Sequence, residues 1–215
     1  MQAALDSPLQ QILSPEWAAL LVVDVQNDFC HADGLFGRMG LDLSAAHAAV
    51  ERLKEVVQGA RKTGVPVIFV RLDHNSATNS QAWMHRSDTP REDACVSGTW
   101  GAEFFGVFPQ EDEPVVVKRR YSPFAGTDLE YILRATQRKS LLVTGVATNI
   151  CVEQTLRDGF MRDYHVALIE DCSAAYSPEA HASTIANVRS FLGRVTTSKA
   201  VLQRWDNADQ VLGAA

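Results

Sequence analysis

Three side chains with complementary chemistry stand at the ends of apolar runs in this 215-residue chain. Asp24 closes the run that begins at residue 18, Lys118 closes residues 114–118, and Cys151 follows residues 140–145 after a short turn. A cysteine nucleophile needs a proton acceptor and a positive neighbour, and a carboxylate and an ammonium supply them. Cys151 also begins a predicted helix, where unpaired N–H groups favour a thiolate, so the pattern predicts a lowered pKa for this thiol.

Each of the three residues also has an ordinary structural explanation. A free cysteine is most often a buried and inert side chain. An aspartate after a strand commonly caps a turn, and a lysine at a strand end is commonly a solvated residue that protects the edge of a sheet. Their joint occurrence favours chemistry, provided that the fold brings the three strand ends to one rim.

The chain alternates between strand and helix patterns. Apolar runs predict six strands, at residues 18–24, 65–71, 114–118, 140–145, 165–170 and 193–198. Helices are predicted at residues 43–62, from 127 onward, at 149–162 and 177–192, and after the last strand. This alternation predicts one α/β domain over residues 1–215, with three α/β/α layers and an open, six-stranded, mostly parallel sheet. Ligands of such sheets bind beyond the carboxyl ends of the strands, where the three side chains would meet.

Residues 72–113 interrupt this alternation. They are polar and rich in Gly and Pro, and they carry Trp83, Trp100 and two phenylalanines without a clear period. A segment of this length inside a compact domain is typically functional, so we expect a lid or insert. The two tryptophans would either close a pocket or fill an interface between subunits.

Composition narrows the class of protein. A hydrophobic content of 46% with 21% charged residues is ordinary for a globular protein, and the apolar runs are too short to cross a membrane. The net charge of -6 and the lack of a basic stripe argue against a nucleic-acid partner. The cysteines (Cys30, Cys95, Cys151 and Cys172) show neither a CxxC pair nor a zinc spacing, so we expect free thiols. Without a signal-peptide pattern, the cytoplasm is the expected location.

Three stretches resemble the isochorismatase-like cysteine hydrolases, namely DVQNDF at 24–29, KRRYSPF at 118–124 and GVATNICV at 145–152. The similarity extends from residue 18 to residue 198, and CVEQTLRDGF at 151–160 looks most like the ureidoacrylate amidohydrolase branch, with biuret and triuret hydrolases as neighbours. The resemblance implies a Rossmann-like topology.

The resemblance also implies roles for individual residues. Cys151 would be the nucleophile, Asp24 the general base and acid, and Lys118 the group that orients and polarises them. A cis peptide would join Val146 to Ala147, and the backbone N–H groups of Ala147 and Cys151 would form an oxyanion hole.

The implied reaction is hydrolysis of a C–N bond in a small ureido or carbamoyl amide of the ureidoacrylate, biuret or triuret type. It would pass through a thioester-type acyl-enzyme, release ammonia or a small amine, and need no cofactor. The alternatives are a vinyl ether hydrolase of the isochorismatase type, an amidase acting on N-carbamoyl amino acids or nicotinamide, and a non-catalytic binding protein. Members of the family tend to form dimers or tetramers, so we expect a homo-oligomer. The other expected binding partner is the substrate, a small-molecule amide or ureide.

No catalytic metal is expected. Nicotinamidases of this superfamily carry an Asp-x-His metal motif, whereas Asp73 and His74 are adjacent here. We therefore expect His74 and His85 to be solvated residues of the long segment.

Residues next to the three stretches are candidates for substrate contact. They are Gln26, Phe29, Tyr121, Phe124 and Asn149. The two phenylalanines fit an ordinary core equally well. Arg119 and Arg120 are candidates for holding a substrate carboxylate through a guanidinium fork.

Overall fold

A twisted sheet of six strands runs through the part of the chain that the computed structural model describes, residues 7–87 and 93–212. Its strands are β1 (Ala18–Val23), β2 (Val67–Leu72), β3 (Val115–Lys118), β4 (Ser140–Val146), β5 (His165–Ala174) and β6 (Arg194–Thr196). Their order is β3-β2-β1-β4-β5-β6, and neighbouring strands are parallel throughout. The predicted α/β fold is confirmed, and the sheet is wholly rather than mostly parallel.

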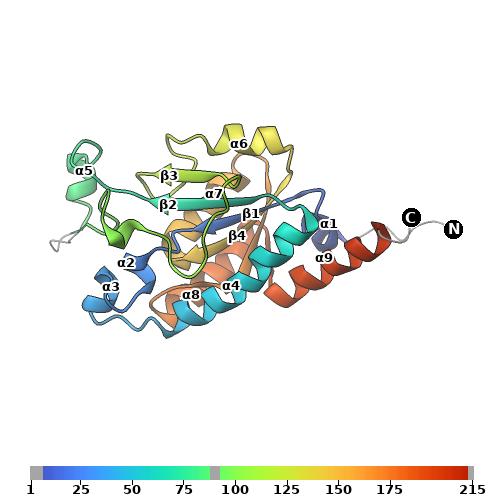
Figure 1. Cartoon of the computed structure of the whole chain (residues 1–215), viewed down its shortest axis with the longest axis horizontal. Coiled ribbons are helices and arrows are strands. Elements are labelled where there is room, and N and C mark those ends of the chain that lie inside the picture. The colour runs from blue at the N-terminus through green and yellow to red at the C-terminus, as the bar shows by residue number, and fades with distance from the viewer. Residues whose placement is uncertain (1–6, 88–92, 213–215) are drawn as a thin grey trace.

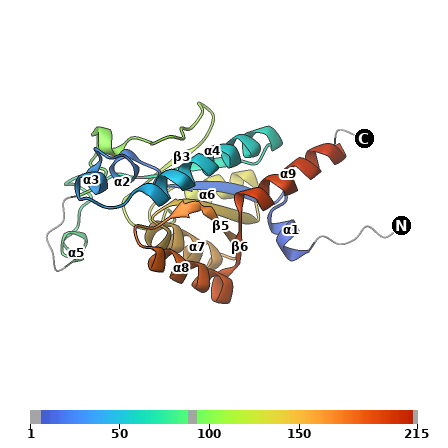
Figure 2. The same cartoon turned by 90° about the horizontal axis from the view of Figure 1, so that it is seen from below.

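Helices cover both faces of this sheet. The α-helices are α1 (Pro8–Ile12), α2 (Asn27–Cys30), α3 (Leu35–Arg38), α4 (Ser44–Thr63), α5 (Gln81–Met84), α6 (Leu129–Thr136), α7 (Glu153–Phe160), α8 (Pro178–Asn187) and α9 (Ser198–Leu212). Short 3-10 and π segments are η1 (Trp100–Ala102), η2 (Thr148–Val152) and η3 (Val188–Leu192). Figure 2 shows α4 and α9 on one side of the sheet and α7 and α8 on the other.

The two faces of the sheet bury separate apolar clusters. Strand β1 serves both, because successive side chains of a strand point to opposite faces. Leu20 and Val22 pack with α4 and α9, whereas Leu21 and Val23 pack with α6 and α7. All six residues of β1 are buried, as the continuous apolar run predicts for a central strand. No described helix combines the length and apolar character needed to cross a membrane.

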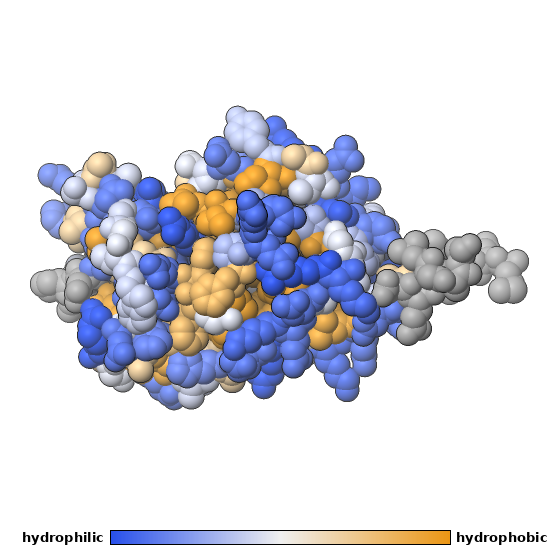
Figure 3. Space-filling model, in the orientation of Figure 1, coloured by the Kyte–Doolittle hydropathy of each residue, from blue (hydrophilic) through white to orange (hydrophobic). Residues whose placement is uncertain are grey.

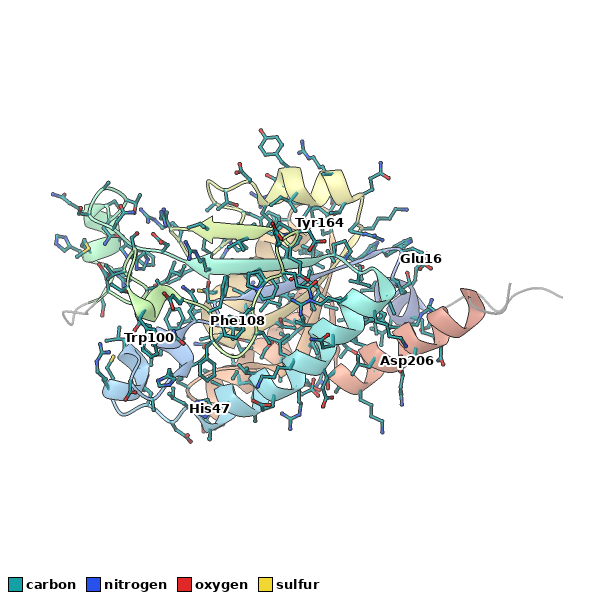
Figure 4. All side chains as sticks on the ribbon, in the orientation of Figure 1. Glu16, His47, Trp100, Phe108, Tyr164 and Asp206 are labelled. Atoms are coloured by element: carbon teal, nitrogen blue, oxygen red, sulfur yellow. The ribbon has the colours of Figure 1, made fainter. Side chains whose placement is uncertain are left out.

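The carboxyl ends of the strands all face one end of the molecule. Figure 1 shows the short helices α2, α3 and α5 at this end, while α1 and the end of α9 lie at the opposite one. Figure 3 shows the side of the molecule that faces the viewer in Figure 1. Hydrophilic residues cover much of this side, and hydrophobic residues gather toward its middle. Figure 4 places Phe108 there, a side chain that is 60% exposed.

Several boundaries differ from the sequence expectations. The helix predicted at 149–162 begins as the π segment η2, and the helix predicted at 177–192 ends in the π segment η3. Strand β5 continues to Ala174, past a shift in its register with β4. Helix α1 was not predicted, because a five-residue helix shows too little of the helical period.

Candidate active site

Asp24, Lys118 and Cys151 meet at the carboxyl ends of β1, β3 and β4. Lys118 Nζ lies 2.8 Å from Asp24 Oδ2 and 3.3 Å from Cys151 Sγ, and it also donates to the backbone oxygen of Arg120 at 3.1 Å. Asp24 and Lys118 are fully buried, and Cys151 is 6% exposed. The strand order changes direction between β1 and β4, so Asp24 and Cys151 stand at the point where open α/β sheets bind ligands.

The backbone around Asp24 is held in an unusual conformation. Asp24 has a φ of 53°, in the left-handed region that a residue with a Cβ rarely adopts. Its N–H donates to Val70 O at 2.9 Å, and its own oxygen accepts from Gln26 N at 2.9 Å. Such a conformation persists when its surroundings enforce it, and it is typical of functional sites.

Cys151 is positioned by the turn that follows β4. Gly145 pairs with Val23 at a φ of 113°, and a Cβ built on it would lie 1.9 Å from Val23 O. The Val146–Ala147 peptide bond is cis, as the resemblance implied. Cys151 then falls inside η2, immediately before α7, and its own backbone oxygen accepts from Thr155 Oγ1 at 2.6 Å.

The predicted lowering of the Cys151 pKa is wrong. Burial raises the pKa of this thiol, the negative charge of Asp24 raises it further, and the nearby Lys118 only partly opposes them. Cys151 lies inside a π segment rather than at a free helix N-terminus, and this position does not offset the effect of burial on the pKa of the thiol. At neutral pH the resting side chain is therefore a neutral thiol.

Burial also controls the other two groups. It raises the pKa of Asp24, although Lys118 and Cys151 act in the opposite direction. Burial acts to lower the pKa of Lys118, but Asp24 and Cys151 outweigh it, so the pKa of Lys118 is raised. The arrangement therefore holds a charged ammonium beside a carboxylate whose affinity for a proton is enhanced.

A cavity of about 570 Å³ opens onto Cys151 and accommodates a small molecule. Of the predicted substrate-contact residues, Phe29 and Tyr121 line it. Phe124 packs in the apolar core beside α6 and α7, and Asn149 is exposed outside the lining. Val146 and Ala147 also line the cavity, next to Cys151.

Gln26 has a structural position instead of a place in the lining. Its Nε2 donates to Leu72 O and Ala102 O, both at 2.8 Å, while its Oε1 accepts from Leu72 N at 2.8 Å. The fully buried amide therefore joins the end of β2 to the long segment. The neighbouring Asp28 acts similarly, since its carboxylate accepts from the N–H groups of Leu35 at 3.0 Å and Cys95 at 2.7 Å.

The segment 72–113 supplies one wall of the cavity. Leu72, His74, Trp83, Arg86 and Ala94 all line it. The expectation of a solvated His74 is wrong, because its backbone pairs with Val96 and its ring nitrogen Nδ1 bonds to Ala94 O, so the residue lies in the interior and is 2% exposed.

Other predicted residues of this region lie outside the cavity. His85 is exposed, as expected. Trp100 is 46% exposed, does not line the cavity, and contacts the His31 ring edge-on at 4.9 Å. Figure 4 labels Trp100 at the end of the molecule where Figure 1 shows α2 and α3.

Neither candidate arginine lines the cavity. Arg119 pairs with the Asp73 carboxylate and donates to Asp73 O at 2.7 Å. Arg120 donates to Arg119 O at 2.6 Å and to Thr78 O at 3.2 Å. Among the described residues, the arginine in the lining is Arg86, which had no distinguishing signal in the sequence.

Tyr176 is a further lining residue that was not predicted. Its hydroxyl donates to Phe29 O at 2.8 Å and so ties the end of β5 to α2. The only signal was its place shortly after a predicted strand, at the same rim as the other three groups.

Among residues 7–87 and 93–212, no three His, Cys, Asp or Glu side chains are grouped so that they could hold a metal ion. The four cysteines are free and buried. Beside the cavity stand the Cys151 thiol, the Asp24 carboxylate and the Lys118 ammonium.

Comparison with known proteins gives matches over most of the chain. A family model described as the isochorismatase domain matches residues 18–200. The ureidoacrylate amidohydrolase RutB of Methylobacterium radiotolerans is 33% identical over 200 residues, which cover 86% of this chain and 78% of that protein. RutB of Azorhizobium caulinodans is 34% identical over 198 residues, which cover 85% of this chain and 87% of that protein. A cysteine hydrolase structure from Pseudomonas syringae pv. phaseolicola is similar with a TM-score of 0.78 at 26% identity, over 97% of this chain and all of that one (100%).

Proposed function

The chain belongs to the isochorismatase family, and from this premise we propose that it is a cysteine-dependent amidohydrolase acting on a small ureido or carbamoyl amide. One observation carries the proposal. Lys118 Nζ contacts both Cys151 Sγ and Asp24 Oδ2, at 3.3 and 2.8 Å, beside a cavity of small-molecule size. A thiol with a proton acceptor and a fixed positive charge is the equipment of covalent acyl transfer.

The first half of the proposed reaction forms the acyl-enzyme. Asp24 takes the thiol proton, and the Cys151 thiolate, stabilised by the Lys118 ammonium, attacks the carbonyl carbon. The backbone N–H groups of Ala147 and Cys151 hold the oxyanion, and one such donor typically contributes about 3 kcal/mol to lowering the barrier. Asp24 then gives its proton to the leaving nitrogen, so ammonia or a small amine departs and a thioester remains.

The second half regenerates the thiol. Asp24 takes a proton from water, the hydroxide attacks the thioester carbonyl, and the C–S bond breaks. The proton on Asp24 returns to the Cys151 sulfur, so the enzyme ends in its initial protonation state. The raised pKa of Asp24 suits both halves, because a carboxylate must hold the proton between its transfer from sulfur and its transfer to nitrogen.

The proposed substrate class is a ureide of the ureidoacrylate, biuret or triuret type. Two relatives at 33 and 34% identity are named ureidoacrylate amidohydrolases, and this chain covers most of their length. The mostly apolar cavity, with the aromatic rings of Phe29 and Tyr121 in its wall, fits a small, flat molecule.

An ammonia-release screen of the purified protein tests the proposal. Its substrates are ureidoacrylate, biuret, triuret, N-carbamoyl amino acids, nicotinamide and maleamate, and we expect turnover of at least one ureide. Cys151→Ala should abolish that turnover, while Cys172→Ala, which removes a thiol equally buried in β5, should retain it. The wild-type protein mixed with substrate and quenched should show the mass of an acyl adduct on the peptide that carries Cys151.

Two results would contradict the proposal. Full activity of Cys151→Ala would exclude covalent catalysis by this thiol. Hydrolysis of a vinyl ether such as isochorismate that does not need Cys151, without release of ammonia from any amide, would favour the vinyl ether alternative instead.

A further inference from the structure

The π segment η2, which carries the thiol, is tied to helix α8 at both of its ends. At its first residue, Thr148 Oγ1 lies 2.9 Å from His181 Nδ1. Directly after its last residue, the Glu153 carboxylate accepts from Thr184 Oγ1 at 2.5 Å and from Asn187 Nδ2 at 3.2 Å. The three residues of α8 follow one another at intervals of three, so they are neighbours on the surface of that helix.

A π segment is a rare form of backbone that depends on its surroundings. Its hydrogen bonds reach five residues along the chain instead of four, and Val152 N donates in this way to Ala147 O at 3.3 Å. Such segments are mostly single turns, and they are frequent at functional sites. Cys151 lies within this turn, so the geometry of the turn determines how Sγ approaches Lys118 Nζ, 3.3 Å away.

The contact between Thr148 and His181 lies in the protein interior and outside the cavity. Thr148 is fully buried, and His181 is half-buried. A buried hydroxyl that loses its partner costs free energy, which favours keeping the two side chains together. Neither residue lines the cavity, so an effect of either one on turnover has to pass through η2.

We propose that His181 is a positioning residue for Cys151. Through Thr148 it holds η2 in the π geometry, which keeps Sγ beside the Lys118 ammonium and fixes the N–H groups of the proposed oxyanion hole. Glu153 secures the other end of the segment. The inference rests on the proposed function, and it adds a side chain outside the cavity that acts on the chemical step and not on substrate binding.

The first test removes the hydrogen bond at His181 and then restores it. His181→Ala removes it without weakening α8 itself, because alanine forms helices better than histidine. His181→Asn puts a hydrogen-bonding atom where Nδ1 stood, whereas His181→Gln puts one farther out, near the position of Nε2. For a ureide that the wild type hydrolyses, kcat should fall at least about tenfold in His181→Ala and His181→Gln and should recover to within about threefold in His181→Asn, with KM changed by less than about twofold throughout.

Thr148 supplies the matching pair of variants. Thr148→Val keeps the shape of the side chain and removes the hydroxyl, so kcat should fall as in His181→Ala, whereas Thr148→Ser keeps the hydroxyl and should stay near the wild type. The double variant Thr148→Val with His181→Ala should be no slower than the slower single variant, because both changes remove the same contact. His165→Ala is the control: this exposed histidine stacks on Trp17 outside the cavity lining, and its loss should leave kcat unchanged.

Alkylation of Cys151 by iodoacetamide reports on the position of the sulfur without any substrate. The Lys118 ammonium acts to lower the pKa of the thiol, so a sulfur that moves away from it forms less thiolate. In mildly alkaline buffer, with mass spectrometry of the peptide that carries Cys151, alkylation should be about tenfold slower in His181→Ala, the effect of one pKa unit, and should be restored in His181→Asn.

The positioning role is overturned if kcat of His181→Ala equals that of the wild type, or if alkylation of Cys151 in this variant is unchanged or faster. A lower melting temperature with both rates intact would show a purely structural contact. Additive losses in the double variant would also overturn the role, because the two side chains would then act separately. The proposed function is judged by the wild type alone: if it releases no ammonia from any ureide, the function fails, and the alkylation rates still decide the role of His181.

Discussion

Cys151 shows how burial and charge set the protonation state of a thiol. Its thiol lies 3.3 Å from the Lys118 ammonium, yet burial and Asp24 raise its pKa. Burial disfavours the charged form of any isolated group, and one cation shared with a carboxylate does not fully compensate. In the proposed mechanism the thiolate is therefore made during the reaction, when Asp24 takes the proton, and is not stored in the resting protein.

Lys118→Met tests the role of the shared ammonium. The change removes the positive charge but nearly preserves the side-chain volume. We expect kcat/KM to fall at least about a hundredfold, by analogy with the loss of one electrostatic group in other active sites. The acid limb of the pH profile should also move upward, because Asp24 loses the charge that lowers its pKa.

Lys139→Met is the control for that substitution. Lys139 lies 4.7 Å from the centroid of the Trp17 ring, outside the cavity lining, so its loss should leave kcat/KM unchanged. Activity of Lys118→Met within threefold of the wild type would show that the ammonium does not act on the chemistry.

The raised pKa of Asp24 predicts the pH dependence of the reaction. Asp24 must be ionised to accept the thiol proton, so kcat/KM should fall as the pH drops through its pKa. Because burial raises that pKa, the acid limb should lie above about 4, the ordinary value for an aspartate. A profile of kcat/KM between pH 3 and 9 measures it, and an acid limb at or below pH 4 would contradict the assignment of Asp24 as the base.

Linkage gives the sign of the accompanying change in stability. The folded state retains the Asp24 proton at pH values where the unfolded chain has lost it. The contribution of Asp24 to the free energy of unfolding is therefore greatest below its unfolded pKa and decreases as the pH rises through its raised folded pKa. The paired Lys118 has a raised pKa, so its own contribution is lost only as the pH rises through that value.

At the scale of elements, the ends of β1 and β4 determine where Asp24 and Cys151 lie. Asp24 adopts a left-handed φ, and Gly145 beside it leaves room for the Val23 carbonyl. The two strands are paired from Ala18 and Ser140 up to this point, so any shift in their register would move both groups. The amide of Gln26 then fastens β2 and residue 102 to the same rim.

Gly145→Ala tests how closely β1 and β4 must approach. The new Cβ would lie 1.9 Å from Val23 O, so the strands would have to separate. We expect a loss of at least about 3 kcal/mol in the free energy of unfolding, comparable to other strained or overpacked substitutions. Chemical denaturation followed by circular dichroism measures the change.

Gly64→Ala is the matched control for that effect. Gly64 ends α4 at a φ of 69°, and nothing lies within 4 Å of a Cβ built on it. Only the cost of a positive φ applies, so we expect a loss of about 1 kcal/mol. Equal losses for the two alanine variants would show that the contact with Val23 is not what requires Gly145.

At the scale of the whole molecule, the chain is organised around one functional end. The helices α2, α3 and α5 gather at the carboxyl ends of the strands, and the described part of residues 72–113 contributes a wall of the cavity (Figure 1). The expected role of this segment as a lid or insert stays a prediction. Of its two tryptophans, Trp83 lines the cavity and Trp100 remains at the surface.

The homo-oligomer also stays a prediction, and it is tested by the mass of the protein in solution. We expect a dimer or tetramer in sedimentation velocity and light scattering across a tenfold range of concentration. A mass of one 23.6 kDa chain throughout that range would contradict the expectation. A dependence of ammonia release on protein concentration would show whether assembly matters to the site.

The amino-acid sequence by itself determined the sheet and the three central side chains. Continuous apolar runs specify buried strands through a local period, and polar residues directly after such runs must lie at the carboxyl rim of a parallel sheet. Asp24, Lys118 and Cys151 could therefore be identified before their distances were known.

Only the tertiary structure decided the protonation state of Cys151 and the surroundings of His74, Trp83 and Gln26. These depend on burial and on hydrogen bonds between segments far apart in the chain, such as Gln26 with residues 72 and 102, or His74 with Ala94. Such contacts involve irregular backbone, whose sequence shows neither a helical nor a strand periodicity. Burial by distant segments, rather than position next to a helix, sets the pKa of the thiol and encloses the His74 and Trp83 rings at the cavity wall.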